Sequence, residues 1–415
     1  MDADTPPVTG NAAPVLRRVL GLPLLVFYGM GVTIGAGIFA LIGEILGIAG
    51  DLTPLVFLVA AVLAGASAGS YAFLSGRFPK AAGAAVYAKA GFGPGLARVT
   101  GIGVALTGVI SAAVISLAFG SYLGTLVPVP SWLLAIGLLV LLSVVASLGV
   151  RESIILAAVV TVVEVGTLLV VIGAGLPELA DAELWGRIAT FPTTAGLGVV
   201  LAATTVAFYA FIGFEDIVNM AEETRRPERV MAWAVIITLT LTTVVYLAVA
   251  SIAVAVGDRA PIATSDAPMA DLFAELTGGS PAPIAAIAAV AMINGVLIQI
   301  VMASRVLYGM AREGLLRPSW LGTIHPRRRT PIYATLAVAG TIAVLLLVLP
   351  IVRLAEVTSY VTLGVFTVVN LSLWRLSRRS AERGSRFRAA WGLGAAALSI
   401  GILVADIVRR TGAIG

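Results

Sequence analysis

Apolar runs long enough to cross a lipid bilayer follow one another along almost the whole sequence. A membrane-spanning α-helix needs about 20 mostly apolar residues, and eleven runs approach or exceed that length. Their ranges are 20–48, 52–76, 95–126, 131–149, 153–175, 196–221, 230–256, 281–311, 331–349, 354–375 and 389–408. In hydrocarbon, a helix satisfies its own backbone polar groups. The sequence therefore predicts an all-α polytopic membrane protein with about eleven transmembrane helices.

The composition agrees with a protein embedded in lipid and excludes several kinds of site. Hydrophobic residues make up 59% of the chain and charged residues only 12%, with a mean hydropathy of +1.03, whereas soluble domains carry about 25% charged residues. The sequence contains no cysteine and a single histidine, His325, which rules out disulfides, thiolate metal sites and His-based catalytic triads. We therefore expect no cofactor, no bound metal and no enzymatic activity.

The positive charges indicate how the chain is oriented. If the N-terminus lies in the cytosol, 22 of the 27 Lys and Arg residues fall in the predicted cytosolic segments. The five that fall outside are Arg187, Arg259, Arg353, Arg409 and Arg410. Cytosolic loops carry the excess of Lys and Arg in membrane proteins, so this asymmetry predicts a multi-pass cell-membrane protein with a cytosolic N-terminus. The excess of Lys and Arg in the cytosolic segments accounts for the net charge of +5. We therefore expect no nucleic-acid partner.

Two terminal segments and one loop are predicted to lie outside the helical core. Residues 1–18 are polar and contain three prolines, which is typical of a tail, here cytosolic. Residues 377–415 are predicted to form a basic cytosolic loop and a peripheral eleventh helix. Residues 268–277, with the sequence PMADLFAELT, favour a short amphipathic helix on the outer surface.

Two of the apolar runs are interrupted in a way that ordinary membrane helices are not. The first contains three glycines within TIGAGIFALIGE at 33–44, and the second contains Gly213 followed closely by two acids in FYAFIGFEDIVNMAEETRRPER at 208–229. Broken backbone at membrane depth is tolerated only where it lines a cavity or is buried in protein. Interrupted segments in corresponding positions of two halves indicate the substrate site of a transporter. The sequence thus predicts a solute carrier.

Four stretches spread over nearly the whole chain carry a family resemblance. They are TIGAGIFALIGE at 33–44, GRFPKAAGAAVYAKAGFG at 76–93, the block at 208–229, and ASRVLYGMAREGLL at 303–316. Together, and in this order, they resemble the amino acid–polyamine–organocation superfamily, especially its cationic amino acid transporter branch and bacterial relatives. The resemblance implies secondary active transport by alternating access, with cationic or neutral amino acids as substrate.

The resemblance also implies a fold of five-plus-five inverted repeats, similar to LeuT, in which helices 1 and 6 are the broken ones. The ten-helix transport core would occupy residues 19–376, with repeat one at about 19–176 and repeat two at about 195–376. The eleventh helix would then be peripheral to the core.

A broken helix offers backbone groups to a ligand, because the ends of its halves lack their helical partners. The amides beside the first break suit a carboxylate, and the carbonyls beside the second suit an ammonium group. Tyr209 aligns with the aromatic residue that closes over the substrate in relatives. The alternative is that the helices are kinked merely for packing. The predicted substrate-binding residues are Ile34, Gly35, Ala36, Gly37, Ile38, Tyr209, Ala210 and Ile212.

Two acids are predicted to couple transport to protons, since ionisable residues inside a membrane are functional by default. Glu164 lies in the middle of the fifth run, and several bacterial relatives place a lysine linked to proton coupling there. It can serve as a proton carrier, as a ligand for Na⁺, or as a structural acid. Glu215 matches an acid implicated in proton coupling in an arginine/agmatine exchanger of this superfamily. Its alternative role is to offset the partial charge of a helix N-terminus.

Other functions are also compatible with a membrane protein of this length. A channel would favour rings of one charge or a symmetric filter, and the sequence shows neither. A membrane-embedded enzyme would need a nucleophile and a base, but the chain lacks cysteine and its one histidine lies in a polar loop. Within transport, an exchanger or exporter without proton coupling remains the alternative to proton-driven uptake.

Overall fold

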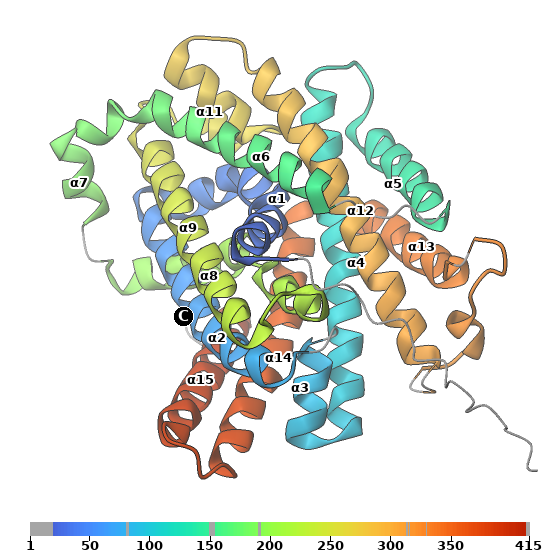
Figure 1. The fold of residues 1–415 in the computed structure, drawn as a ribbon. Helices are drawn as coiled ribbons and strands as arrows, with labels where there is room; N and C mark the ends of the chain where they lie inside the picture. The colour runs from blue at the N-terminus through green and yellow to red at the C-terminus, as the bar shows by residue number, and fades with distance from the viewer. Residues whose placement is uncertain are drawn as a thin grey trace, which may run out of the picture.

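Helices make up almost all of the chain that the computed structural model describes (Figure 1). The described residues are 20–79, 83–148, 154–189, 192–312, 314, 316–328 and 330–411. The predicted cytosolic tail at 1–18 lies outside them. An isolated parallel bridge pairs Leu20 with Thr224, and it places the start of the described chain beside the segment that follows the second interrupted run.

The helices reproduce the apolar runs of the sequence. The long ones are α1 (Leu22–Ala49), α2 (Thr53–Arg77), α4 (Pro94–Gly124), α5 (Ser131–Leu148), α6 (Ile154–Gly175), α8 (Thr194–Tyr209), α9 (Pro227–Ala255), α12 (Ala282–Arg312), α13 (Ile332–Val348), α14 (Ile351–Arg378) and α15 (Ser385–Arg410). Each predicted run coincides with one of them to within four residues, and the sixth run continues from α8 into η3 (Phe214–Glu223).

Short helices occupy the connections. They are η1 (Gly50–Leu52), α3 (Gly83–Phe92), η2 (Glu178–Ala180), α7 (Ala182–Ile188), α10 (Ala260–Ala263), α11 (Pro268–Thr277) and η4 (Ser319–Gly322). The predicted amphipathic helix is confirmed, because α11 covers the same ten residues. Its buried residues, Met269 and Leu272 among them, pack inward from the connection between α9 and α12.

The described part of the chain contains nine stretches long and apolar enough to cross a membrane. One of them, Gly37–Arg77, joins the second half of α1 to α2, while the first half of α1 and α13 are shorter apolar helices. Large apolar side chains are exposed on α5, α9 and α13, which is the pattern of a surface in contact with lipid. The chain is therefore a multi-pass membrane protein.

Helix α1 lies in the middle of the bundle, with α6, α8, α9 and α12 packed against it (Figure 1). Its residues Ile34, Ile38 and Leu41 are completely buried. Because membrane helices are not driven together by the hydrophobic effect, close backbone approach at small residues stabilises such packing. The two interrupted runs, α1 and α8 with η3, are direct neighbours at the centre.

Helix α15 lies at the periphery and packs along α14 in an antiparallel hairpin (Figure 1). Asp406, whose side chain is fully buried, accepts hydrogen bonds from Arg409 at 2.8 Å and Arg410 at 3.0 Å. Arg410 also pairs with Glu356 near the start of α14. These contacts fix the end of α15 to the start of α14, so the last helix runs the full length of its neighbour.

Candidate functional site

The first break is confined to one residue. Within α1, Gly35 alone departs from helical geometry, with φ 11° and ψ −134°. A side chain at Gly35 would meet no heavy atom within 4 Å, so there is space beside the backbone at this point. By contrast, Gly37 is buried, and a Cβ there would lie 2.6 Å from the Cα of Ala210. Gly37 thus lets the first broken helix contact the second.

The second break is a tight turn. Helix α8 ends at Tyr209, and the amides of Ala210, Phe211 and Ile212 each donate to the carbonyl three residues earlier, at 3.0 to 3.1 Å. Gly213 has φ +129°, and a Cβ on it would lie 2.8 Å from the carbonyl oxygen of Val32. Only glycine adopts this conformation at low cost and fits against α1. The turn then continues as η3.

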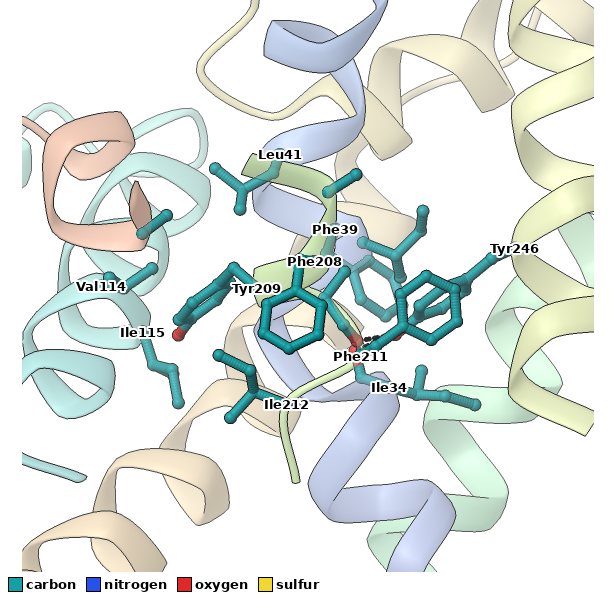
Figure 2. Close-up of a cluster of buried hydrophobic side chains, with 14 of the residues drawn as sticks. Ile34, Phe39, Leu41, Val114, Ile115, Phe208, Tyr209, Phe211, Ile212 and Tyr246 are labelled. Carbon is teal, nitrogen blue, oxygen red and sulfur yellow. Dashed lines mark hydrogen bonds between the residues drawn. The ribbon is translucent and has the colours of Figure 1, made fainter. Parts of the chain in front are cut away.

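One side chain connects the two breaks. The hydroxyl oxygen of Tyr246, on α9, lies 2.9 Å from the carbonyl oxygen of Ala210, 3.1 Å from that of Thr33 and 3.4 Å from that of Ile34 (Figure 2). A phenol has one hydrogen to donate, so three carbonyls share one donor. Tyr246 is not among the site residues predicted from the sequence. The signal that could have found it is a lone tyrosine in an apolar run, since a buried tyrosine hydroxyl usually needs a partner.

Tyr209 lies on the opposite side of the breaks from Tyr246. Its phenol extends towards Val114 and Ile115 of α4 (Figure 2), and its hydroxyl lies near Ser111. The residue is only 5% exposed. Helix α4 therefore forms one wall of the region around the predicted substrate residues.

The predicted substrate-binding residues are thus brought together, from two segments far apart in the sequence. Ile34, Ile38 and Ala210 are fully buried, and Ile212 is 9% exposed. Ala36 lies in α1 directly after Gly35, but its side chain is outside the described set. The carbonyl of Tyr209 accepts from the Ile212 amide at 3.1 Å, and that of Ala210 faces Tyr246.

A second buried tyrosine lies beside α1 and α11. Tyr122, on α4, donates its hydroxyl hydrogen to the carbonyl of Phe39 at 2.6 Å and accepts from the amide of Met269 at 3.1 Å. It thereby ties α1 to α11. Beside it lies a cavity of about 210 Å³, with Glu44 and Asp266 in its lining.

Glu164 lies on α6, close to the breaks, and is only 3% exposed. Its Oε2 atom has no hydrogen-bond partner, and it forms no ion pair with any described residue. Helix α6 packs against both α1 and α9, and the Glu164 carboxyl is near enough to Tyr246 to interact with it electrostatically. A buried carboxyl without a compensating cation is costly when ionised.

Glu215 is tied to the second break. One carboxylate oxygen accepts a hydrogen bond from the Gly213 amide at 2.8 Å, across the first turn of η3. The neighbouring Asp216 is buried and accepts from the side chain of Asn219 at 3.3 Å. This hydrogen bond links Glu215 to the turn, and its alternative role at a helix N-terminus stays a prediction. Its role in proton coupling stays a prediction.

Comparisons with known proteins agree with this geometry. A family model described as amino acid permease matches residues 20–409. An uncharacterized transporter of Mycobacterium tuberculosis is 32% identical over 368 residues, which cover 86% of this chain and 80% of that protein. The chloroplastic cationic amino acid transporter 9 of Arabidopsis thaliana is 30% identical over 95% of this chain and 73% of its own length.

More distant comparisons concern one further permease and the fold. The branched-chain amino acid permease BcaP of Bacillus subtilis is 26% identical over 90% of this chain and 84% of its own length. The crystal structure of MhsT in complex with L-phenylalanine superimposes with a TM-score of 0.66 at 14% identity, covering 94% of this chain and 99% of that one. The fold is thus the LeuT-like one, and the chain belongs to the amino acid permease family of the amino acid–polyamine–organocation superfamily.

Proposed function

We propose that the protein is a secondary active transporter that takes up amino acids by alternating access, with its substrate site at the two breaks. One observation carries this proposal: the broken helices contact each other at Gly37 and Ala210, while space remains beside Gly35. An amino acid needs one partner for its carboxylate and one for its ammonium group within a few ångströms. Two adjacent breaks offer both from the backbone alone.

The carboxylate is assigned to the amides from Gly35 to Ile38, at the start of the second half of α1. Amides at the N-terminal end of a helix point towards an anion, and the helix dipole favours its charge. Because Gly35 has no side chain and faces open space, an anion can approach the backbone there. Isoleucine side chains on both sides exclude water and so strengthen these hydrogen bonds.

The ammonium group is assigned to the carbonyls of Tyr209, Ala210 and Ile212. The Ala210 carbonyl is already engaged by the Tyr246 hydroxyl, but two other carbonyls lie within reach of the same hydroxyl. The ammonium group of an arriving substrate can therefore donate to the Ala210 carbonyl, while the Tyr246 hydroxyl donates to the Thr33 carbonyl. This exchange leaves neither carbonyl without a donor, which matters because an unsatisfied buried polar group costs about 1–3 kcal/mol.

Proton coupling is assigned to Glu164. The carboxyl is buried, lacks an ion pair among the described residues and lies on a helix that packs against α1. A change in the position of α1 alters the access of water to it. The group is then neutral when the site is dry and ionised when water enters, which links proton movement to the conformational cycle. The Na⁺-ligand role is the less favoured interpretation.

The substrate class is proposed to be cationic or neutral amino acids. Relatives are named as cationic amino acid transporters in one case and as a branched-chain permease in another. The protein is proposed to lie in the cell membrane with its N-terminus in the cytosol, on the basis of the distribution of Lys and Arg.

A transport assay with Glu164→Gln tests this mechanism. The variant mimics the neutral carboxyl, so reconstituted protein should still exchange internal for external substrate. It should lose accumulation driven by an acid exterior, because no proton is carried at that site. The matched control is Glu178→Gln, which neutralises an exposed acid just beyond the same helix. A panel of labelled amino acids in the exchange assay identifies the substrate.

If Glu164→Gln concentrates substrate as well as the wild type, the proton role passes to Glu215 or the protein is an exchanger without coupling. If neither protein exchanges any amino acid of the panel, the proposed function itself is wrong.

A further inference from the structure

A second site lies far from the broken helices, where α14 is connected to α15. The two helices end in a hairpin at the edge of the bundle (Figure 1). Between them is a cavity of about 450 Å³, larger than the cavity of about 210 Å³ beside Tyr122. Its lining includes Trp374 and Arg378 of α14, and Arg386 and Leu393 of α15. No part of the proposed transport mechanism uses this cavity.

One wall of the cavity carries positive charge without a compensating acid. Arg378 and Arg386 are exposed, and neither forms an ion pair with a described residue. The acid of the connecting loop, Glu382, is engaged elsewhere, by Arg388 at 2.7 Å and Arg77 at 3.9 Å. The hydroxyl-bearing residues Ser377, Ser380 and Ser385 also line the cavity. This wall thus offers guanidinium groups and hydroxyls to an anion.

The rest of the lining, here called the other wall, is apolar, and its residues lie on two helices apolar enough to cross a membrane. The guanidinium of Arg378 lies over the ring of Trp374, 5.5 Å from its centroid, and the indole continues the lining towards Ala390 and Leu393. Leu393 is 49% exposed on the outside of α15. The cavity sits where two membrane-spanning segments end, at Arg378 and Ser385. Tryptophan is enriched at this depth, the boundary between hydrocarbon and headgroups.

We propose that this cavity binds the headgroup of an anionic phospholipid. Its phosphate would accept hydrogen bonds from Arg378 and Arg386, since guanidinium matches the geometry of phosphate oxygens. Its acyl chains would lie along Trp374 and Leu393. A free phosphate ion would use only the charged wall, whereas a lipid uses both. Basic pockets between helices on the cytosolic side bind anionic headgroups, and the distribution of Lys and Arg predicts that this hairpin lies on that side.

Lipid binding to the full-length protein in neutral detergent tests the proposal. Native mass spectrometry would count phosphatidylglycerol and phosphatidylcholine retained from mixed micelles. The wild type should retain phosphatidylglycerol in preference to phosphatidylcholine. One arginine near a membrane surface contributes about fivefold to the affinity for an anionic lipid, so R378Q/R386Q should bind phosphatidylglycerol about thirtyfold more weakly. The matched control is R379Q/R383Q, which removes two exposed charges from the same connection but outside the cavity lining.

A further variant separates charge from folding. R378K/R386K retains both positive charges, so it should keep the preference for phosphatidylglycerol, even if the glutamine variant is unstable in detergent. Equal retention of both lipids by the wild type would overturn the proposal. So would equal losses in R378Q/R386Q and R379Q/R383Q. Displacement of the lipid by millimolar inorganic phosphate would show that the cavity is a site for a soluble anion.

Discussion

The two helix breaks are different structures, although the same pattern of glycine in an apolar run predicts both. The first consists of Gly35 alone and has open space beside it. The second is a turn over residues 210–213, held by its own hydrogen bonds, by the Glu215 carboxylate and by contact between Gly213 and Val32. One break therefore leaves room for a ligand, while the other is a rigid turn that packs against the first.

The largest effect on folding and transport is expected from Gly213→Ala, which alters the turn of the second break. At φ +129° an alanine is strained, at a cost of about 1–3 kcal/mol. Its Cβ would also lie 2.8 Å from the Val32 carbonyl, which is backbone and cannot turn away. We expect little folded protein and no transport, measured by size-exclusion chromatography and uptake. Gly198→Ala, in α8 with open space around it, is the control and should behave as the wild type.

Normal yield and uptake for Gly213→Ala would mean that the second break is adaptable, and that the contrast between the two breaks is not real.

A smaller effect is expected from Gly37→Ala, which acts on the contact between the breaks. The backbone there is helical, so the substitution adds no conformational strain. The new methyl group, however, would lie 2.6 Å from the Cα of Ala210, and overpacking of this kind costs about 1–3 kcal/mol. We expect a protein that is inserted in the membrane but has a lower unfolding temperature and much weaker substrate binding.

The comparison for Gly37→Ala is Gly340→Ala, at a helical glycine of α13 that has no neighbour within 4 Å. Equal substrate affinity in the two variants would show that the site does not depend on the distance between the breaks.

Much of this architecture is predictable from the sequence because the length of apolar runs reports directly on membrane helices. The predicted boundaries of α4 and α9 agree with the structure within a few residues, and those of α11 are the same. The break at Gly213 is predictable as well, since a glycine close to two acids is unfavourable within a continuous membrane helix. The separate roles of Gly35 and Gly37 are not, because they depend on what lies beside each residue in space.

The contacts that assemble the site are also not predictable. Tyr246 and Tyr122 each bind the backbone of α1 from more than 80 residues away in the sequence, and no local pattern specifies such a partner. For Glu215 the sequence offers two roles, and the contact with the Gly213 amide is visible only in three dimensions. The ion pairs that join Asp406, Arg410 and Glu356 are likewise not predictable, because the hairpin of α14 and α15 brings these residues together.

The smallest effect is expected from Tyr246→Phe, which removes the link between the breaks and keeps the ring. The phenyl group would retain its contacts with Phe57 and Phe211, whose centroids lie 5.7 and 5.1 Å away. The variant leaves a buried carbonyl without the shared donor, and one hydrogen bond is lost, so we take the lower end of the range of about 1–3 kcal/mol. We therefore expect a slightly lower unfolding temperature and a change of about fivefold in the kinetics of uptake. The control is Tyr333→Phe, at an exposed tyrosine of α13.

The kinetic parameter that changes identifies the role of Tyr246. If the Tyr246 hydroxyl releases the Ala210 carbonyl to the substrate ammonium, Tyr246→Phe should lower KM, because no hydroxyl then competes for that carbonyl. A change in the maximal rate alone would instead assign Tyr246 to the movement of the broken helices. Identical kinetics in both variants would mean that the two breaks are held together by packing at Gly37 and Gly213, without help from a shared hydrogen bond.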